Sequence, residues 1–184
     1  MLDRLLALLM RPWVMRGLGA FERRYRYDMR YARELFEASP RAFLQLNRLF
    51  AVARFAPGLS PAMLAAAKFA ATRREDCGPC SQLALDMARE AGVPPALLRA
   101  LVAGDENAMS ADMRRAWRYA QAALDHDAAL PVHAEALRLH HGASALSSLA
   151  LALTVARCFP ALKYALGHGQ SCQRLVINEE GLTP

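Results

Sequence analysis

Hydrophobic residues recur along most of this chain at the three- and four-residue spacing of amphipathic helices. Proline and glycine interrupt the pattern where a helix is expected to stop. No segment stands out with the strict alternation of a β-strand, and no internal repeat stands out either. The pattern therefore predicts an all-α fold with helices near residues 2–10, 28–38, 40–55, 60–74, 79–91, 94–103, 109–125, 131–141 and 144–167.

Several helix boundaries carry specific signals. Ser39 precedes Pro40, and Ser60 precedes Pro61. In both pairs a capping hydroxyl comes directly before a proline, which suits the first position of a helix. Pro160 is expected to end or kink the last helix, because proline lacks the backbone donor that a helix interior needs.

The leucine-rich start of the chain looks superficially like a secretory signal, but Asp3 and the following Arg11-Pro12-Trp13 fit one poorly. The chain has no run of eighteen uncharged apolar residues, so the sequence predicts no ordinary membrane span. We expect helix 2–10 to dock on the body of the protein or on a neighbouring subunit. A peripheral membrane anchor is the alternative.

Length and composition agree with this picture. The 184 residues suffice for one sizeable hydrophobic core, which predicts a single compact unit. The 37 alanines and the scarcity of Val, Ile and Thr favour helix over strand. The net charge of +6 is an N-terminal property, since residues 1–74 carry 14 Lys and Arg against 5 Asp and Glu. The arginines are scattered at helical spacings, so we interpret them as solvated faces and salt bridges.

Arginines and tyrosines are interleaved between Phe21 and Tyr31, a composition that can stack on single-stranded nucleic acid. However, Tyr27 and Tyr31 are four residues apart and share one helix face. We therefore interpret the segment as a helix that packs an aromatic edge against its own core, and we expect no nucleic-acid partner.

The chain has four cysteines, Cys77, Cys80, Cys158 and Cys172. Without an export signal a framework of structural disulfides is not expected, and we predict a cytoplasmic protein. Cys158, near the end of an apolar helix, is expected to be a buried small hydrophobe. Cys172 lies on a glycine-rich turn and is a candidate for an accessible third redox thiol.

The close pair Cys77 and Cys80 suits either redox chemistry or metal binding. Zinc would need two further ligands. His140 and His141 are candidates, but the chain has no second C-x-x-C and no pair of histidines at the usual spacing. We therefore expect no metal and no other cofactor.

The pair comes directly before a helical pattern, which places Cys77 near the N-cap and Cys80 in the first turn. Free backbone N–H groups and the helix dipole favour the thiolate at both positions, and the spacing suits an intramolecular disulfide. Position alone favours Cys77 as the more acidic and more exposed thiol. Glu75, beside the pair, is a candidate proton acceptor.

Four features in order give the sequence a resemblance to a known family. They are Cys77-Gly78-Pro79-Cys80, the alanine-rich helix after it, the stop Ala91-Gly92-Val93 and the following Leu97-Leu98-Arg99-Ala100-Leu101. This family is the alkyl hydroperoxidase D-like branch of the carboxymuconolactone decarboxylase superfamily. The resemblance covers roughly residues 60–170 and is moderately specific. It implies a helical bundle of residues 56–184 preceded by an N-terminal helical extension of residues 1–55.

The resemblance also implies an activity. In such proteins an oligomer reduces a peroxide with its two cysteines, and a dithiol reductant restores them. By correspondence, Cys80 is the peroxidatic cysteine and Cys77 the resolving one. The expected partners are a second copy of this chain, a small peroxide or disulfide substrate and a dithiol reductant.

The sequence departs from the family pattern at its proton relay. Ala84 stands where the family has a histidine four residues after the second cysteine, and Ala65 where it has a glutamate before the first. A general acid or base at such a site is worth ~10²–10⁴ in rate. Candidate substitutes are Glu75, Gln82, Asp86, His133, His140 and His141.

Three functions follow from these observations. The first is a thiol-disulfide oxidoreductase or peroxidase with a C-x-x-C pair at a helix N-terminus. The second is a non-catalytic interaction module on the same fold, for which Ala84 is the main argument. The third is a decarboxylase-like lyase, a branch that does not depend on a C-x-x-C.

Overall fold

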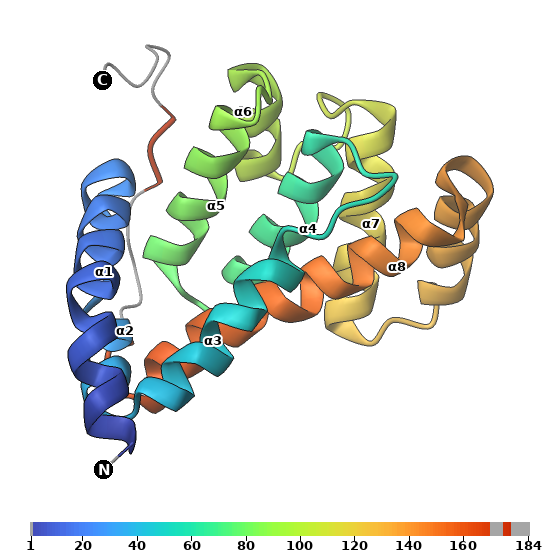
Figure 1. The fold of residues 1–184 in the computed structure, drawn as a ribbon. Coiled ribbons are helices and arrows are strands. Elements are labelled where there is room, and N and C mark those ends of the chain that lie inside the picture. Colours follow the sequence, from blue (N-terminus) through green and yellow to red (C-terminus); the bar gives the residue numbers. More distant parts are fainter. Residues whose placement is uncertain (1, 170–174, 178–184) are drawn as a thin grey trace.

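A computed structural model of the protein describes residues 2–169 and 175–177 (Figure 1). Within these residues the chain forms eight helices and no strand, which confirms the all-α fold. The helices are α1 (Leu2–Tyr25), α2 (Arg30–Ala38), α3 (Pro40–Ala53), α4 (Pro61–Arg74), α5 (Gly78–Glu90), α6 (Pro95–Ala103), α7 (Ala111–Asp125) and α8 (Leu130–Ala165).

Helix α4 forms the centre of the body and contacts mainly α5, α7 and α8. Most of its buried positions are alanines, including Ala65, Ala66, Ala67, Ala70 and Ala71. An alanine side chain is a single methyl group, so three neighbouring helices approach α4 closely. As predicted, the hydroxyl of Ser60 caps this helix at the backbone N–H of Met63, and Ser39 caps α3 in the same way.

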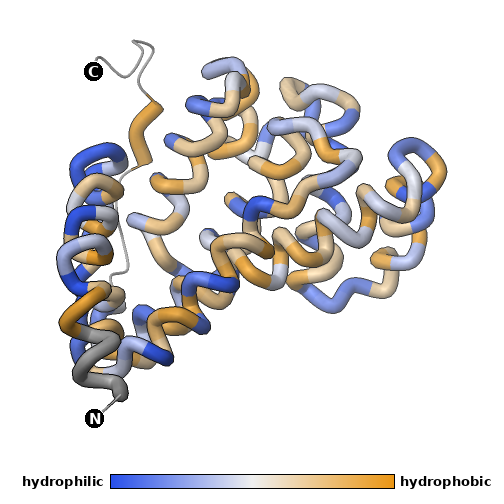
Figure 2. The backbone as a smooth tube through the Cα atoms, viewed as in Figure 1, coloured by the Kyte–Doolittle hydropathy of each residue, from blue (hydrophilic) through white to orange (hydrophobic). Residues whose placement is uncertain are grey.

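Helices α1, α2 and α3 pack on one another at one side of the molecule, and α3 joins them to the body by lying against α8 (Figure 1). Hydrophobic and hydrophilic positions alternate along the helices, as amphipathic packing requires (Figure 2). A cluster of buried residues joins this part of the chain to the cysteine pair; it comprises Leu18, Tyr27, Met29, Tyr31, Ala32, Phe36, Phe43, Leu46, Cys77 and Cys80.

Two prolines lie inside helices, Pro12 in α1 and Pro160 in α8. The helix expected over residues 2–10 continues through Pro12 to Tyr25, and the last helix continues through Pro160 to Ala165. An interior proline costs about 3 kcal/mol of helix stability. Tertiary packing offsets this cost, most clearly at Pro160, which is fully buried. The short first helix is therefore a wrong prediction, whereas the predicted helix 144–167 extends past Pro160 as α8 does, and Pro160 does not end it.

Gly142 separates the two last predicted helices, as expected. It lies within α8 with φ 84° and ψ 165°, values that are not helical. Glycine adopts this conformation readily because it has no Cβ. Helix α8 thus consists of two helical segments that meet at a kink.

The segment rich in tyrosine and arginine is not one helix, contrary to expectation. Helix α1 ends at Tyr25, Arg26 has a left-handed φ of 49°, and α2 begins at Arg30. The reversal of the chain at Arg26 accounts for the interruption. The packing prediction is confirmed, because Tyr27 and Tyr31 are only 4% and 2% exposed.

One described helix, α8, is long and apolar enough by length and composition to cross a membrane. Its residues contact α3, α4 and α7, as those of a core helix in a helical protein also do. Length and composition alone therefore do not assign this protein to a membrane.

Candidate functional site

The cysteine pair lies at the start of α5, as the sequence predicts. Cys77 is the N-cap residue, and Cys80 lies in the first helical turn. The turn that precedes the helix includes Asp76 in a left-handed conformation, with φ 48°. The two sulfur atoms are 2.06 Å apart and form a disulfide. The expected intramolecular bond is therefore present.

Both cysteines are buried beneath the N-terminal helices. Cys77 is 2% exposed and Cys80 is 4% exposed. The prediction that Cys77 is the more exposed thiol is wrong, because the cluster built by α1, α2 and α3 encloses both residues. Position at the helix terminus therefore does not decide which sulfur a substrate reaches.

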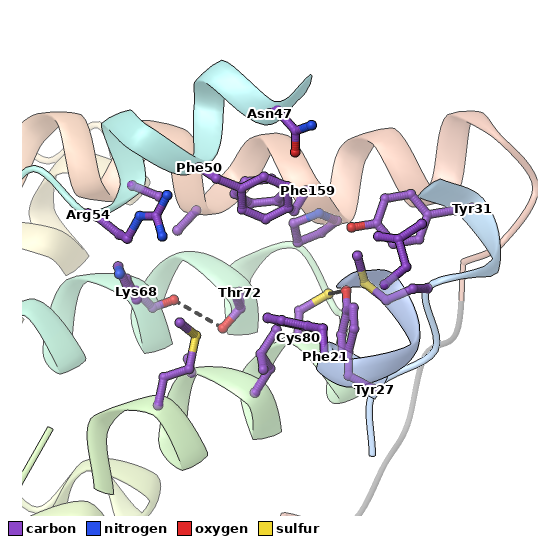
Figure 3. A pocket seen from close by; sticks show the side chains of 18 of the residues that line it. Phe21, Tyr27, Tyr31, Asn47, Phe50, Arg54, Lys68, Thr72, Cys80 and Phe159 are labelled. Atoms are coloured by element: carbon purple, nitrogen blue, oxygen red, sulfur yellow. Dashed lines mark hydrogen bonds between the residues drawn. The ribbon is translucent and has the colours of Figure 1, made fainter. Parts of the chain in front are cut away.

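A cavity of about 480 Å³ gives access to one sulfur of the pair. Its walls come from α1, α2, α3, α4, α5 and α8 and from the turn before α2 (Figure 3). Cys80 lines this cavity, whereas Cys77 is not among its lining residues. A molecule in the cavity therefore meets the sulfur of Cys80 first.

The phenol of Tyr27 contacts the same sulfur. Its oxygen lies 3.4 Å from Sγ of Cys80. A disulfide sulfur carries no proton, so in this state the phenol is the donor. Burial, followed by the effect of Tyr31, raises the pKa of Tyr27 well above its usual value. Tyr27 therefore keeps its proton at neutral pH and remains a hydrogen-bond donor.

A buried lysine lies against the two tyrosines. The Nζ atom of Lys163 is 4.7 Å from the ring centre of Tyr27 and 5.8 Å from that of Tyr31. The side chain is 3% exposed, and burial lowers the pKa of Lys163. A cation over a ring face is attracted by the π electrons. This contact fixes the ring of Tyr27 beside the disulfide.

Two further cations lie at the other end of the cavity. Arg54 comes from the end of α3 and Lys68 from the middle of α4 (Figure 3). Burial lowers the pKa of Lys68, and the positive charge of Arg54 lowers it further. The hydroxyl of Thr72 donates to the backbone carbonyl of Lys68 at 3.0 Å. The cavity thus has a sulfur end and a cationic end.

Glu75, the predicted proton acceptor, faces a different surface. Its Oε1 accepts from Nε of Arg157 at 2.5 Å. Both residues line a second cavity with Tyr119, Leu153 and Thr154, away from the sulfur of Cys80. The structure therefore shows Glu75 in an ion pair rather than in contact with the disulfide.

The other candidate relay residues also lie outside the main cavity. Gln82 donates to Oδ1 of Asp86 at 3.0 Å and exchanges two hydrogen bonds with the backbone of Val176. The candidate histidines lie on α8 before its kink, and they are His133, His140 and His141. In the described part of the chain, no group of three or more His, Cys, Asp or Glu side chains is placed to hold a metal ion.

The two alanines that replace the family relay differ in their surroundings. Ala84 lies on the cavity wall one turn after Cys80, as the helical spacing predicts. Ala65 is buried in α4 and is not among the residues that line the cavity. The space beside Cys80 is thus bounded at position 84 by a methyl group.

The two cysteines outside the pair are Cys158 and Cys172. The sequence predicts a buried Cys158, but the structure shows it half-buried, at a position of α8 that other helices cover only in part. Its thiol donates to the backbone carbonyl of Thr154 at 3.4 Å. Cys172, the candidate third redox thiol, lies outside the described residues.

Sequence reasoning missed the polar residues of the cavity. Tyr27 lines the cavity and contacts Sγ of Cys80, and Lys163 contacts the ring of Tyr27. Both come from elements far from α5 in the sequence. One signal was available, because Lys68 and Lys163 are the only two lysines among the 23 lysine and arginine residues. A buried amine can lose its charge, whereas a guanidinium keeps its charge, so a lone lysine in an apolar helix indicates a special site.

Comparison of this chain with models of protein families, with curated protein sequences and with solved structures found no match. Any functional assignment therefore rests on the residues and the geometry described above.

Proposed function

We propose that this protein is a thiol-disulfide oxidoreductase that reduces a small peroxide or disulfide. The observation that carries the proposal is the Cys77–Cys80 disulfide at a helix N-terminus, with Cys80 alone facing a cavity. In the reduced protein the helix N-terminus favours the thiolate form of both cysteines. The cavity offers the substrate a route to one of them.

The proposed reaction has two steps. The thiolate of Cys80 attacks the O–O bond of a hydroperoxide, giving a sulfenic acid on Cys80 and an alkoxide. The proton that the Cys80 thiol released converts the alkoxide to the alcohol. The thiol of Cys77 then attacks the sulfenic sulfur, water leaves, and the disulfide forms. An external dithiol restores the reduced pair by exchange, in keeping with a reducing cytoplasm.

Contact with the cavity supports the assignment of Cys80 as the peroxidatic cysteine. The resemblance implies the same roles, whereas the helix terminus alone favours Cys77. The resolving thiol needs no access to substrate, and Cys77 is the more buried of the two. It needs only to reach the other sulfur, which a single helical turn provides.

Tyr27 supplies the hydrogen bond that the missing histidine would give. Its hydroxyl is within 3.4 Å of Cys80 Sγ and keeps its proton at neutral pH. A donor at this place stabilises the thiolate before attack and the developing oxyanion during attack. The geometry therefore favours a catalytic donor from the N-terminal helices in place of a histidine at position 84.

The test is a peroxide-consumption assay with dithiothreitol as reductant and cumene hydroperoxide as substrate. Cys80→Ser is expected to abolish turnover, and Cys77→Ser to leave a sulfenic acid on Cys80 that dimedone traps. Cys158→Ser is the matched control and is expected to retain the rate. Dimedone on Cys77 in Cys80→Ser, with none on Cys80 in Cys77→Ser, would reverse the roles. Turnover by Cys80→Ser would overturn the mechanism.

The second candidate is a non-catalytic interaction module. The alanine at position 84 favours it, because no imidazole is present to move a proton beside Cys80. A reduced protein that is inert toward peroxides and disulfides alike, with both thiols titratable, would favour this alternative.

A further inference from the structure

Two positively charged side chains line one end of the cavity. Arg54 and Lys68 lie at one end, and Cys80 and Tyr27 lie at the other (Figure 3). Within the described residues, no carboxylate forms an ion pair with either cation. Several other arginines of the N-terminal helices are paired, as Arg33 is with Glu22 and Arg11 with Glu37.

An unpaired lysine in this position is costly. Lys68 is half-buried and is the only charged residue of the segment 61–72, in which the surrounding side chains are apolar. Burying an ammonium without a partner favours its neutral form, and the nearby guanidinium adds repulsion. An anion placed between the two side chains would remove both penalties. The two cations therefore form a site suited to a carboxylate.

The walls between the two ends are apolar. The rings of Phe50 and Phe159 are stacked with their centres 4.8 Å apart, and Leu83 and Met87 of α5 line the same cavity. A volume of about 480 Å³ lies in the range of ~300–1,000 Å³ typical of small-molecule sites. Such walls suit a hydrocarbon chain or ring rather than a polar ligand.

We infer that the cavity binds an elongated apolar molecule that carries a carboxylate at one end. The carboxylate lies between Lys68 and Arg54, and the hydrocarbon part lies along Phe50 and Phe159. This inference rests on the proposed function for its last step, in which the opposite end of the molecule presents a peroxide or disulfide group to Cys80. The substrate class is therefore an amphipathic organic acid, for example a long-chain carboxylic acid that bears a hydroperoxide.

The test is calorimetric binding of decanoate to the oxidised protein. Decanoate carries no group that reacts with thiols, so its binding does not depend on the redox proposal. We expect decanoate to bind at least tenfold more tightly than decanol, because a charge-assisted contact is worth about 10- to 100-fold. Octanoate is expected to bind about 15-fold more weakly than decanoate, since each buried methylene contributes about fourfold.

Variants assign the binding to the two cations. Lys68→Met is expected to weaken decanoate binding by about tenfold or more and to leave decanol binding unchanged. Arg54→Met provides a second, independent variant on another helix. Arg48→Met is the matched control, since Arg48 is an exposed cation of α3 that does not line the cavity.

Two results would overturn the inference. One is equal binding of decanoate and decanol, which would mean that the cations make no contact with the ligand. The other is unchanged decanoate binding in folded Lys68→Met and Arg54→Met. If decanoate binds as expected but peroxides are not turned over, the binding site stands and the redox function fails.

Discussion

Replacing Tyr27 by phenylalanine removes one oxygen atom from the site and retains the ring that contacts Phe21 and Lys163. The lost contact is the donor 3.4 Å from Sγ of Cys80. Removal of one donor to an oxyanion typically costs ~10²–10³ in kcat. Sulfur accepts hydrogen bonds weakly, so we expect the lower end of this range. A loss of about 100-fold corresponds to ~2.7 kcal/mol of transition-state stabilisation.

The same substitution is expected to change the free energy of unfolding by only about 1 kcal/mol, because a neutral hydrogen bond contributes ~0.5–1.5 kcal/mol. The apparent pKa of the Cys80 thiol is expected to rise, since a donor to the thiolate favours the charged form and this donor is removed. The assay is single-turnover oxidation of the reduced protein by cumene hydroperoxide over a range of pH. Urea unfolding is measured beside it.

Tyr119→Phe is the control for this experiment. Tyr119 is a buried tyrosine of α7 that does not line the main cavity, and burial raises its pKa as well. It is expected to leave the rate and the thiol pKa unchanged. An unaltered rate and pH profile in Tyr27→Phe would refute the assignment of Tyr27 as the catalytic donor. A rate loss in Tyr27→Phe that is explained by a large loss in the free energy of unfolding would refute this assignment as well.

The remaining predictions concern other positions. Glu75→Gln is expected to change the peroxide rate by less than about twofold, since Arg157 holds this carboxylate away from the cavity; a tenfold loss would make Glu75 the proton acceptor. Ala84→His adds an imidazole at the cavity wall and should raise the rate of peroxide reduction at least about tenfold, with little change in melting temperature. A folded variant with no gain in this rate contradicts the prediction. The exposed Leu9 and Trp13 of α1 predict a homo-oligomer, which Trp13→Lys should weaken; a light-scattering mass of one 20.2 kDa chain for the wild type would argue against it.

The local features of the site could be predicted from sequence. The N-cap position of Cys77, the helical placement of Cys80 and Ala84 and the disulfide all depend on residues within one or two helical turns. Helix starts at Ser39 and Ser60 were predictable for the same reason, because capping involves only neighbouring residues.

The partners of the disulfide could not be predicted, because they come from distant parts of the chain. Tyr27, which contacts Cys80, precedes it by 53 positions. Lys163, which contacts Tyr27, follows Cys80 by 83 positions. Tertiary packing brings these residues together, and their spacing along the chain does not predict this contact. Packing also explains the prolines inside α1 and α8, where contacts with other helices outweigh the local preference to stop.

Enclosure of the disulfide under α1, α2 and α3 has a consequence for the reduction step of the proposed redox cycle. A redoxin-type protein delivers electrons through a cysteine on its own surface, which must touch the target sulfur during exchange. Here Cys77 and Cys80 are 2% and 4% exposed, and the cavity beside Cys80 has a volume of about 480 Å³, which is typical of a small-molecule site. If the pair is redox-active as proposed, the N-terminal helices limit contact between large electron donors and the disulfide. In the folded conformation, we therefore expect a low-molecular-weight dithiol to regenerate the proposed redox pair faster than a protein of the redoxin type.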